Sequence, residues 1–175
     1  MCMRWSYLQR TIPNIRHYFE PLEDAIKDKL IPSIVGRKVT PLERRIIALP
    51  VRHGGLGIPN PVETADFEFQ SSTNVTKSLV KLITKQKMSI ENYDSNKVKS
   101  EILRMRAKKE TLFNDEFKDI IECAGEELGR NLKLATEKGA GAWLTALPIQ
   151  SYGYALNKQE FKDGSSSIRV SADPL

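Results

Sequence analysis

The sequence predicts a mainly α protein, an irregular helical bundle with Gly/Pro-rich loops and a disordered C-terminal tail. Three observations carry this prediction. Apolar residues recur at intervals of three and four over several stretches, which is the spacing of one face of an α-helix. Capping residues followed by proline stand directly before two of these stretches. The last residues, 164–175, are rich in serine and poor in apolar side chains, which favours disorder.

The first segment, 4–61, is expected to hold short helices. Apolar residues spaced by three or four positions from Ile15 onward predict a turn near 14–19 and then a helix over 21–30. Pro32 is expected to end this helix, because a proline inside a helix removes a hydrogen bond and clashes with the preceding turn.

A second short helix is expected over Pro41–Leu49. Thr40 can cap it, and Glu43 stands three residues later, which is the spacing of a capping box. Arg44 and Arg45 are expected on the side opposite the apolar residues.

The Gly/Pro-rich loop 51–61 leads into the first long helix. Its three glycines and two prolines predict a rigid turn-rich loop. Asn60 then repeats the capping pattern, and the apolar spacing runs on to about Gln86.

The second long helix is expected to begin near Asn96, within a long-helix segment that spans 62–136. A break is expected near Thr111–Asn114, where the charge changes sign. Gly129 and Leu134 are both open as the end of this helix.

The segment 137–163 is expected to hold short C-terminal elements. Residues 142–148 form a short apolar stretch, and Asn157 with Glu160 can cap a final turn. The tail 164–175 completes the division into four segments.

Charge is distributed in two blocks along the long-helix segment. Between Lys77 and Lys109 stand ten basic and three acidic residues, whereas Glu110–Glu127 holds seven acidic residues and one basic. Two interpretations stay open: solvated helix faces that pair with one another, and a phosphate-facing surface beside a repelling one.

Lys77, Lys81 and Lys85 recur every four residues, so they form one row along a helix. Such a row can follow a phosphate backbone without reading its sequence. Arg52 and His53, beside the glycines of the 51–61 loop, are further candidates for a phosphate contact. The predicted nucleic-acid-binding residues are Lys77, Lys81, Lys85, Lys97, Lys99, Arg104, Arg106, Lys108, Lys109, Arg52 and His53.

No catalytic, metal or cofactor site is predicted. The glycines of the loop fit neither a P-loop nor a dinucleotide fingerprint. Cys2, Cys123 and the two histidines lack the close spacing of a zinc site, and two distant cysteines are expected as free thiols. No apolar run of about 18 residues occurs, so no membrane partner is expected. An intracellular location, cytoplasm or nucleus, is the expectation.

Several stretches resemble the reverse transcriptase polyproteins of non-LTR retrotransposons, in the thumb and linker region that follows the polymerase palm. The resemblance covers about residues 4–163. The most distinctive stretch is Leu49–Pro61, which reads LPVRHGGLGIPNP. The others are LQRTIP at 8–13, PLED at 21–24, the Glu43–Arg44 pair, KGAGAWLTALP at 138–148, YGYAL at 152–156 and EFKD at 160–163.

The resemblance implies a fragment of an RNA-directed DNA polymerase without catalysis of its own. The family holds two magnesium ions with an aromatic-x-Asp-Asp signature, which this sequence lacks, so no catalytic residue carries over. The fingers and palm are expected to precede Met1. After Asp163 the chain departs from the family's pattern, which continues into a Cys/His-rich segment, and this departure indicates a truncated, spliced or degenerate gene product.

The implied partners are RNA or an RNA–DNA hybrid, together with the missing polymerase domain or another chain. The alternative is a helical protein-interaction domain with no nucleic-acid role, in which the two charge blocks pair with each other or with a second chain. Without the upstream domain, the apolar faces at 15–30 and 62–83 are expected to lack cover, which predicts marginal stability.

Overall fold

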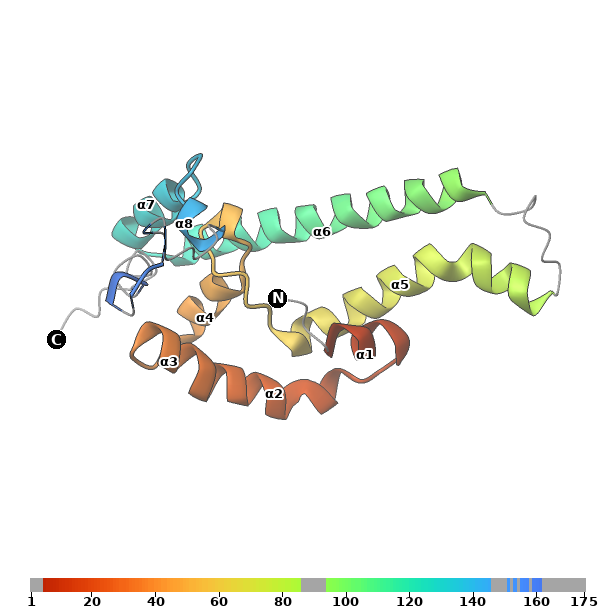
Figure 1. Cartoon of the computed structure of the whole chain (residues 1–175), viewed down its shortest axis with the longest axis horizontal. Coiled ribbons are helices and arrows are strands. Elements are labelled where there is room, and N and C mark those ends of the chain that lie inside the picture. Colours follow the sequence, from red (N-terminus) through yellow and green to blue (C-terminus); the bar gives the residue numbers. More distant parts are fainter. Residues whose placement is uncertain are drawn as a thin grey trace. The chain divides into compact units, whose positions relative to one another are not determined.

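The structure, a computed structural model, describes residues 5–85, 94–145, 151, 153, 155–157 and 159–161 (Figure 1). Most of these residues are helical and none forms a strand, which confirms the mainly α prediction. The predicted tail 164–175 lies outside the described residues. The division into four consecutive segments stays a prediction.

The described helices include two long ones and several short ones. In chain order they are α1 (Trp5–Thr11), the 3-10 turn η1 (Arg16–Phe19), α2 (Glu20–Ala25), the π-helical turn η2 (Ile26–Leu30), α3 (Ile31–Val35), α4 (Pro41–Ala48), the 3-10 turn η3 (Val51–His53), α5 (Pro61–Thr84), α6 (Ser95–Cys123), α7 (Glu126–Ala135) and α8 (Ala142–Thr145).

The chain divides into two compact units that are each discontinuous in sequence. Unit 1 combines Met1–Glu23 with Asn60–Leu112, and unit 2 combines Asp24–Pro59 with Phe113–Leu175. Helix α6 therefore supplies residues to both units.

In unit 1, α1 and η1 pack on α5 (Figure 1). The side chain of Gln9 is buried there and donates from Nε2 to the carbonyl oxygen of Pro61 at 2.7 Å and to Thr64 Oγ1 at 3.2 Å. These bonds satisfy a buried amide, which otherwise costs stability. The buried apolar side chains of unit 1 are few among the described residues: Phe19, Ala65 and Met105.

The predicted apolar face of α5 is covered only in its first half. Ala65 is buried, whereas Leu79 and Ile83 are exposed by 39% and 51%. The helix itself confirms the prediction, because it begins at Pro61 with the Asn60 side chain accepting from the Val62 and Glu63 amides.

Unit 2 holds most of the buried apolar side chains among the described residues. Its core consists of Ile26, Ile31, Ile46, Ile47, Leu49, Ile120, Leu128 and Leu132. Arg45 ties α4 to the second half of α6 by donating from Nε to Glu116 Oε1 at 2.7 Å and by pairing with Asp119.

The prediction that Pro32 ends the first helix was wrong. Helical structure continues from Arg16 through Pro32 to Val35, where Gly36 closes it with a φ of 86°. The π turn η2 interrupts the α-helical hydrogen bonds just before the proline, as the Ile31 amide donates to the Ile26 carbonyl. Because proline has no amide to donate and crowds the preceding turn, a helix accommodates it best where that ladder is already open.

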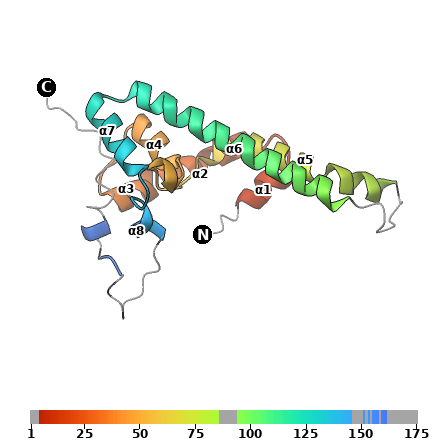
Figure 2. The ribbon, with the colours of Figure 1, turned by 90° about the horizontal axis from the view of Figure 1, so that it is seen from above.

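The long helix α6 neither breaks near Thr111–Asn114 nor reaches Gly129 or Leu134. It runs without interruption to Cys123, and α7 begins at Glu126 after a sharp change of direction (Figure 2). Gly125 carries the break with an extended backbone, φ −61° and ψ 163°. Glu126 and Glu127 then stand in the first turn of α7, where negative charge favours a helix start.

Helix α4 confirms its predicted start. Thr40 Oγ1 accepts from the Glu43 amide at 3.2 Å, and Glu43 Oε2 accepts from the Thr40 amide at 2.8 Å. Arg44, expected on the side opposite the apolar residues, is buried and donates to the carbonyl oxygens of Ile58 and Pro59 at 2.9 and 3.3 Å. A guanidinium can be buried in this way because carbonyls satisfy its donors.

The predicted turn at Asn157 also forms. The Asn157 amide donates to Glu160 Oε2 at 2.8 Å, and Asn157 Oδ1 accepts from the Glu160 amide at 3.0 Å. Helix α8 occupies the start of the predicted apolar element 142–148, whose remaining residues lie outside the described ones.

Candidate nucleic-acid-binding surface

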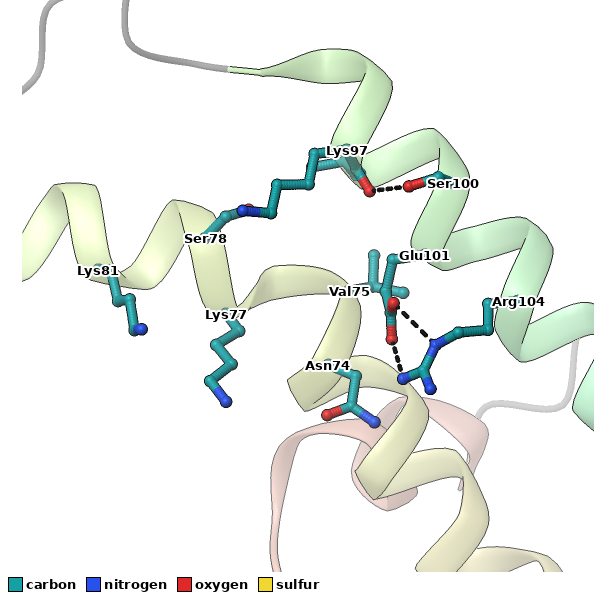
Figure 3. A pocket seen from close by; sticks show the side chains of 10 residues that line it. Asn74, Val75, Lys77, Ser78, Lys81, Lys97, Ser100, Glu101 and Arg104 are labelled. Atoms are coloured by element: carbon teal, nitrogen blue, oxygen red, sulfur yellow. Dashed lines mark hydrogen bonds and ion pairs between the residues drawn. The ribbon is translucent and has the colours of Figure 1, made fainter.

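Helices α5 and α6 enclose a groove of about 480 Å³ in unit 1 (Figure 3). We call it the basic groove. Its lining includes Asn74, Lys77, Ser78 and Lys81 from α5 and Lys97 and Arg104 from α6. Four of the eleven predicted binding residues are thereby brought together from two helices that lie apart in the sequence.

The side chains in the groove come from facing turns of the two helices. Figure 3 shows Lys97 extending from α6 towards Ser78 of α5. Arg104 lies further along α6, where its Nε and Nη2 donate to the carboxylate of Glu101 at 3.0 and 2.7 Å. These hydrogen bonds raise the pKa of Arg104 and lower the pKa of Glu101, so both groups are charged at neutral pH.

The lysines carry the uncompensated charge of the groove. Lys77, Lys81 and Lys97 are exposed, and none of them forms an ion pair with a carboxylate among the residues that the structure describes. Glu101, which lines the groove as well, is taken up by Arg104. Three ammonium groups are therefore available to an anion.

A side-chain cap determines where α6, the second wall of the groove, begins. Asp94 Oδ1 accepts from the Asn96 and Lys97 amides at 3.0 and 3.1 Å, which caps the first turn of α6. Lys97 consequently stands in the first turn of the helix, and Arg104 follows two turns later on the same face. The small side chains Ser78 and Ser100 leave the space between the helices open.

The other described basic residues of the block do not line the groove. Lys85, directly after α5, and Lys99, Arg106 and Lys108 of α6 are exposed elsewhere. Lys109 forms an ion pair inside unit 1, because its Nζ donates to Glu68 Oε1 at 2.7 Å. Glu68 also accepts from Arg10 Nε at 2.9 Å, so this carboxylate joins α1, α5 and α6.

Arg52 and His53 belong to unit 2, and both contact other side chains of that unit. His53 is buried with its ring near Phe113 and Phe117, and its Nε2 lies 2.8 Å from Asn114 Oδ1. The Arg52 guanidinium lies 5.9 Å from the centre of the Phe113 ring. Neither is among the residues that line the basic groove.

The glycines of the same loop serve close packing. Gly54 adopts a φ of 79°, and a Cβ on Gly55 would stand 2.1 Å from the Leu49 carbonyl oxygen. The loop therefore requires glycine for its own fold.

Sequence reasoning missed a second groove on the other flank of the lysines. This groove, of about 340 Å³, lies between α5 and the end of α1, and we call it the Phe69 groove. Its lining includes Arg10, Phe69, Thr73, Thr76 and Val80, and it shares Lys77 and Lys81 with the basic groove. The signal was weak because Arg10 lies far from the other residues in the sequence.

Other kinds of site do not come together in the described part of the chain. No three of its histidine, cysteine, aspartate and glutamate side chains are placed to hold a metal ion. None of its helices combines the length and apolar composition that a crossing of a lipid bilayer requires.

Comparison of the chain with protein-family models, with curated proteins and with solved structures finds no match. The resemblance to retrotransposon polyproteins accordingly stays a prediction.

Proposed function

We propose that this chain is a non-catalytic module that binds the phosphate backbone of RNA or of an RNA–DNA hybrid, as a fragment of a retrotransposon reverse-transcriptase-like protein. The observation that carries the proposal is that Lys77 and Lys81 of α5 line the same groove as Lys97 of α6. Clustered ammonium groups without carboxylate partners attract a polyanion and release its counterions.

The composition of the groove favours backbone contact over sequence recognition. Its uncharged polar groups, Asn74, Ser78 and Ser100, are short side chains that suit hydrogen bonds to phosphate and sugar oxygens. Binding of this kind positions a nucleic acid without selecting its sequence, and it weakens steeply as salt rises.

The test is a titration of a fluorescent RNA–DNA hybrid with the full chain at several salt concentrations, followed by anisotropy. The triple variant K77E/K81E/K97E is expected to lose most of the affinity and to flatten the dependence of log K on log salt by about one unit for each lysine. Unchanged affinity in this variant contradicts the proposal.

The matched control reverses three exposed lysines of unit 2, as K27E/K29E/K133E. It changes the net charge of the chain by the same amount, so it separates a local site from a general charge effect. Circular dichroism of both variants checks that the fold is kept. Incorporation of nucleotides on a primed template by the purified chain would contradict the non-catalytic part of the proposal.

A helical protein-interaction domain is the alternative function. It is favoured by the acidic residues exposed on α6 and α7, such as Glu122, Glu126 and Glu127. Part of the acidic block is engaged within unit 2, since Arg45 pairs with Glu116 and Asp119. Light scattering at low and high salt decides: salt-sensitive self-association in the absence of nucleic acid favours this alternative.

A further inference from the structure

We infer that the Phe69 groove receives the bases of an unpaired strand whose phosphates lie on Lys77 and Lys81. This inference rests on the proposed function and narrows its ligand to single-stranded nucleic acid. It assigns a binding role to Phe69, a residue outside the basic block.

The first step is that two chemically different grooves share one lysine ridge. Lys77 and Lys81 line both grooves, so their ammonium groups stand between them. On the α6 side the ridge is flanked by Lys97 and Arg104. On the α1 side it is flanked by an aromatic ring, an apolar side chain and hydroxyl groups.

The second step is that this aromatic side forms one continuous face of α5. Phe69, Thr73, Thr76 and Val80 follow one another at intervals of four, three and four, so they lie along one side of the helix. Phe69 is only partly buried and Val80 is 51% exposed, so both retain surface for a ligand. Lys77 stands one turn beyond Thr73 and continues the row that Phe69 and Thr73 begin.

The third step is the match between this surface and a nucleotide. A nucleotide has a charged phosphate, a sugar with hydroxyl groups, and a flat base with a π-face that stacks on aromatic rings whatever its identity. Phosphates on the lysine ridge leave the bases on the side of Phe69. Arg10, whose guanidinium pairs with Glu68, also lines the groove at the end nearest α1.

The fourth step excludes a duplex as the favoured ligand. In a duplex the π-faces of the bases are covered by their neighbours, so Phe69 gains no stacking contact. Single strands expose these faces, and proteins bind them by combining a basic track with aromatic platforms.

The experiment measures anisotropy of three labelled oligonucleotides of about twelve residues with the full chain at constant salt. They are a single strand, a duplex of the same sequence, and a single strand with abasic sites that keeps every phosphate. The single strand is expected to bind at least about fivefold more tightly than either of the others, which is the low end of a single stacking contact.

Variants at Phe69 connect this difference to the ring. Phe69→Leu keeps an apolar side chain but removes the π-face, so it is expected to bring the single strand down to the affinity of the abasic strand. Phe69→Trp is expected to restore the difference. Phe67→Leu, on the same helix and outside the lining of the groove, serves as the matched control. Circular dichroism confirms that each variant folds.

The outcomes separate the inference from the proposed function. If all three oligonucleotides bind with equal affinity and the K77E/K81E/K97E variant loses that affinity, the inference is overturned and the proposed backbone binding remains. If the chain binds none of the three oligonucleotides, both the inference and the proposed function are overturned. An acidic peptide of alternating glutamate and leucine is added as a competitor of the labelled single strand. If the peptide displaces that strand at concentrations at which unlabelled single strand does not, the inference is overturned in favour of a protein ligand.

Discussion

At the scale of single residues, Glu68 shows how unit 1 keeps a charge in its interior. Burial raises the pKa of its carboxyl group, but hydrogen bonds from Lys109 and Arg10 outweigh burial and hold the pKa below the ordinary value of 4.5. The group is therefore ionised at neutral pH. It serves as a joint between three helices rather than as an acid or base.

The first prediction concerns the pH dependence of this joint. Because the pKa is lower in the folded than in the unfolded chain, the carboxylate contributes stability that is complete above about pH 4.5 and is lost as the pH falls through the folded pKa. E68Q is expected to cost about 1–2 kcal/mol at pH 7, since it weakens two charged hydrogen bonds whose donors are partly solvated.

Thermal melts of wild type and E68Q, followed by circular dichroism, measure this effect. The difference between them is expected to shrink as the pH falls below 4.5 and through the lowered pKa of Glu68 in the folded chain, because the wild-type carboxyl then also becomes protonated. D66N, at an exposed position on the same helix, is the control. A difference that is constant with pH would show that the charge of Glu68 is irrelevant.

The second prediction contrasts two glycines of unit 2. Gly55→Ala is expected to destabilise the fold by about 2 kcal/mol or more, because the new Cβ would overlap the backbone carbonyls of Leu49 and Ile46. Gly129→Ala is expected to stabilise it by about 0.5–1 kcal/mol, because this glycine lies inside α7 with free space at the Cβ position.

Urea unfolding monitored by circular dichroism measures both free energies. Similar stability of the two variants would contradict the close packing of the 51–61 loop. The glycines of this loop were correctly recognised from the sequence as turn formers. Their distance to a carbonyl could not be foreseen, because it depends on how α4 and the loop fold back on each other.

At the scale of elements, helix starts were predicted better than helix ends. Thr40 and Asn60 mark the starts of α4 and α5 because the capping bonds join residues within one turn. The ends at Val35 and Cys123 were missed. The first depends on the π turn before Pro32, and the second depends on Gly125, which has no stronger local signal than Gly129.

The third prediction tests the capping box of α4. Thr40→Ala is expected to cost about 1 kcal/mol, since the Glu43 amide loses its acceptor at the start of the helix. Thr40→Ser keeps the hydroxyl and is expected to remain close to wild type. Chemical denaturation of the three proteins under identical conditions measures the difference; equal losses for alanine and serine would contradict a role for the hydroxyl.

At the scale of the whole molecule, the mainly α class followed from local patterns, whereas the pairing of helices did not. Arg10 meets Glu68 and Arg45 meets Glu116 across more than fifty residues of chain. No periodicity within one helix specifies such a contact. The sequence accordingly predicted Lys77 and Lys81 as part of a row on one helix and named Lys97 and Arg104 as further candidates, whereas the groove that these four residues line is seen only in the structure.

The fourth prediction follows from the uneven distribution of the core. Among the described residues, unit 1 buries three apolar side chains and unit 2 buries eight. Because burial of apolar surface is the main stabilising term, unit 1 is expected to open at a lower free energy. Hydrogen exchange followed by mass spectrometry is expected to show faster exchange in peptides from α5 than in peptides from α4 and α7.

Ile47→Ala provides the control for this measurement, since it removes a fully buried side chain of unit 2. It is expected to accelerate exchange in α4 and α7 and to reduce the difference in exchange rate between these helices and α5. Uniform exchange of all peptides in one cooperative step would contradict two units of unequal stability. Such a result would also contradict the marginal stability expected for the apolar faces of this chain.

The π turn at Ile26–Leu30 makes the segment after it sensitive to chain length. One residue advances an α-helix by about 100°. A π turn takes up about one residue more than an α-helical turn, so it absorbs that residue without a rotation of this size. Deleting a single residue within the turn would close it into ordinary α-helix and leave Ile31 close to its present face. The ring of Pro32 would then meet an uninterrupted α-helical hydrogen-bond ladder, which a proline disrupts.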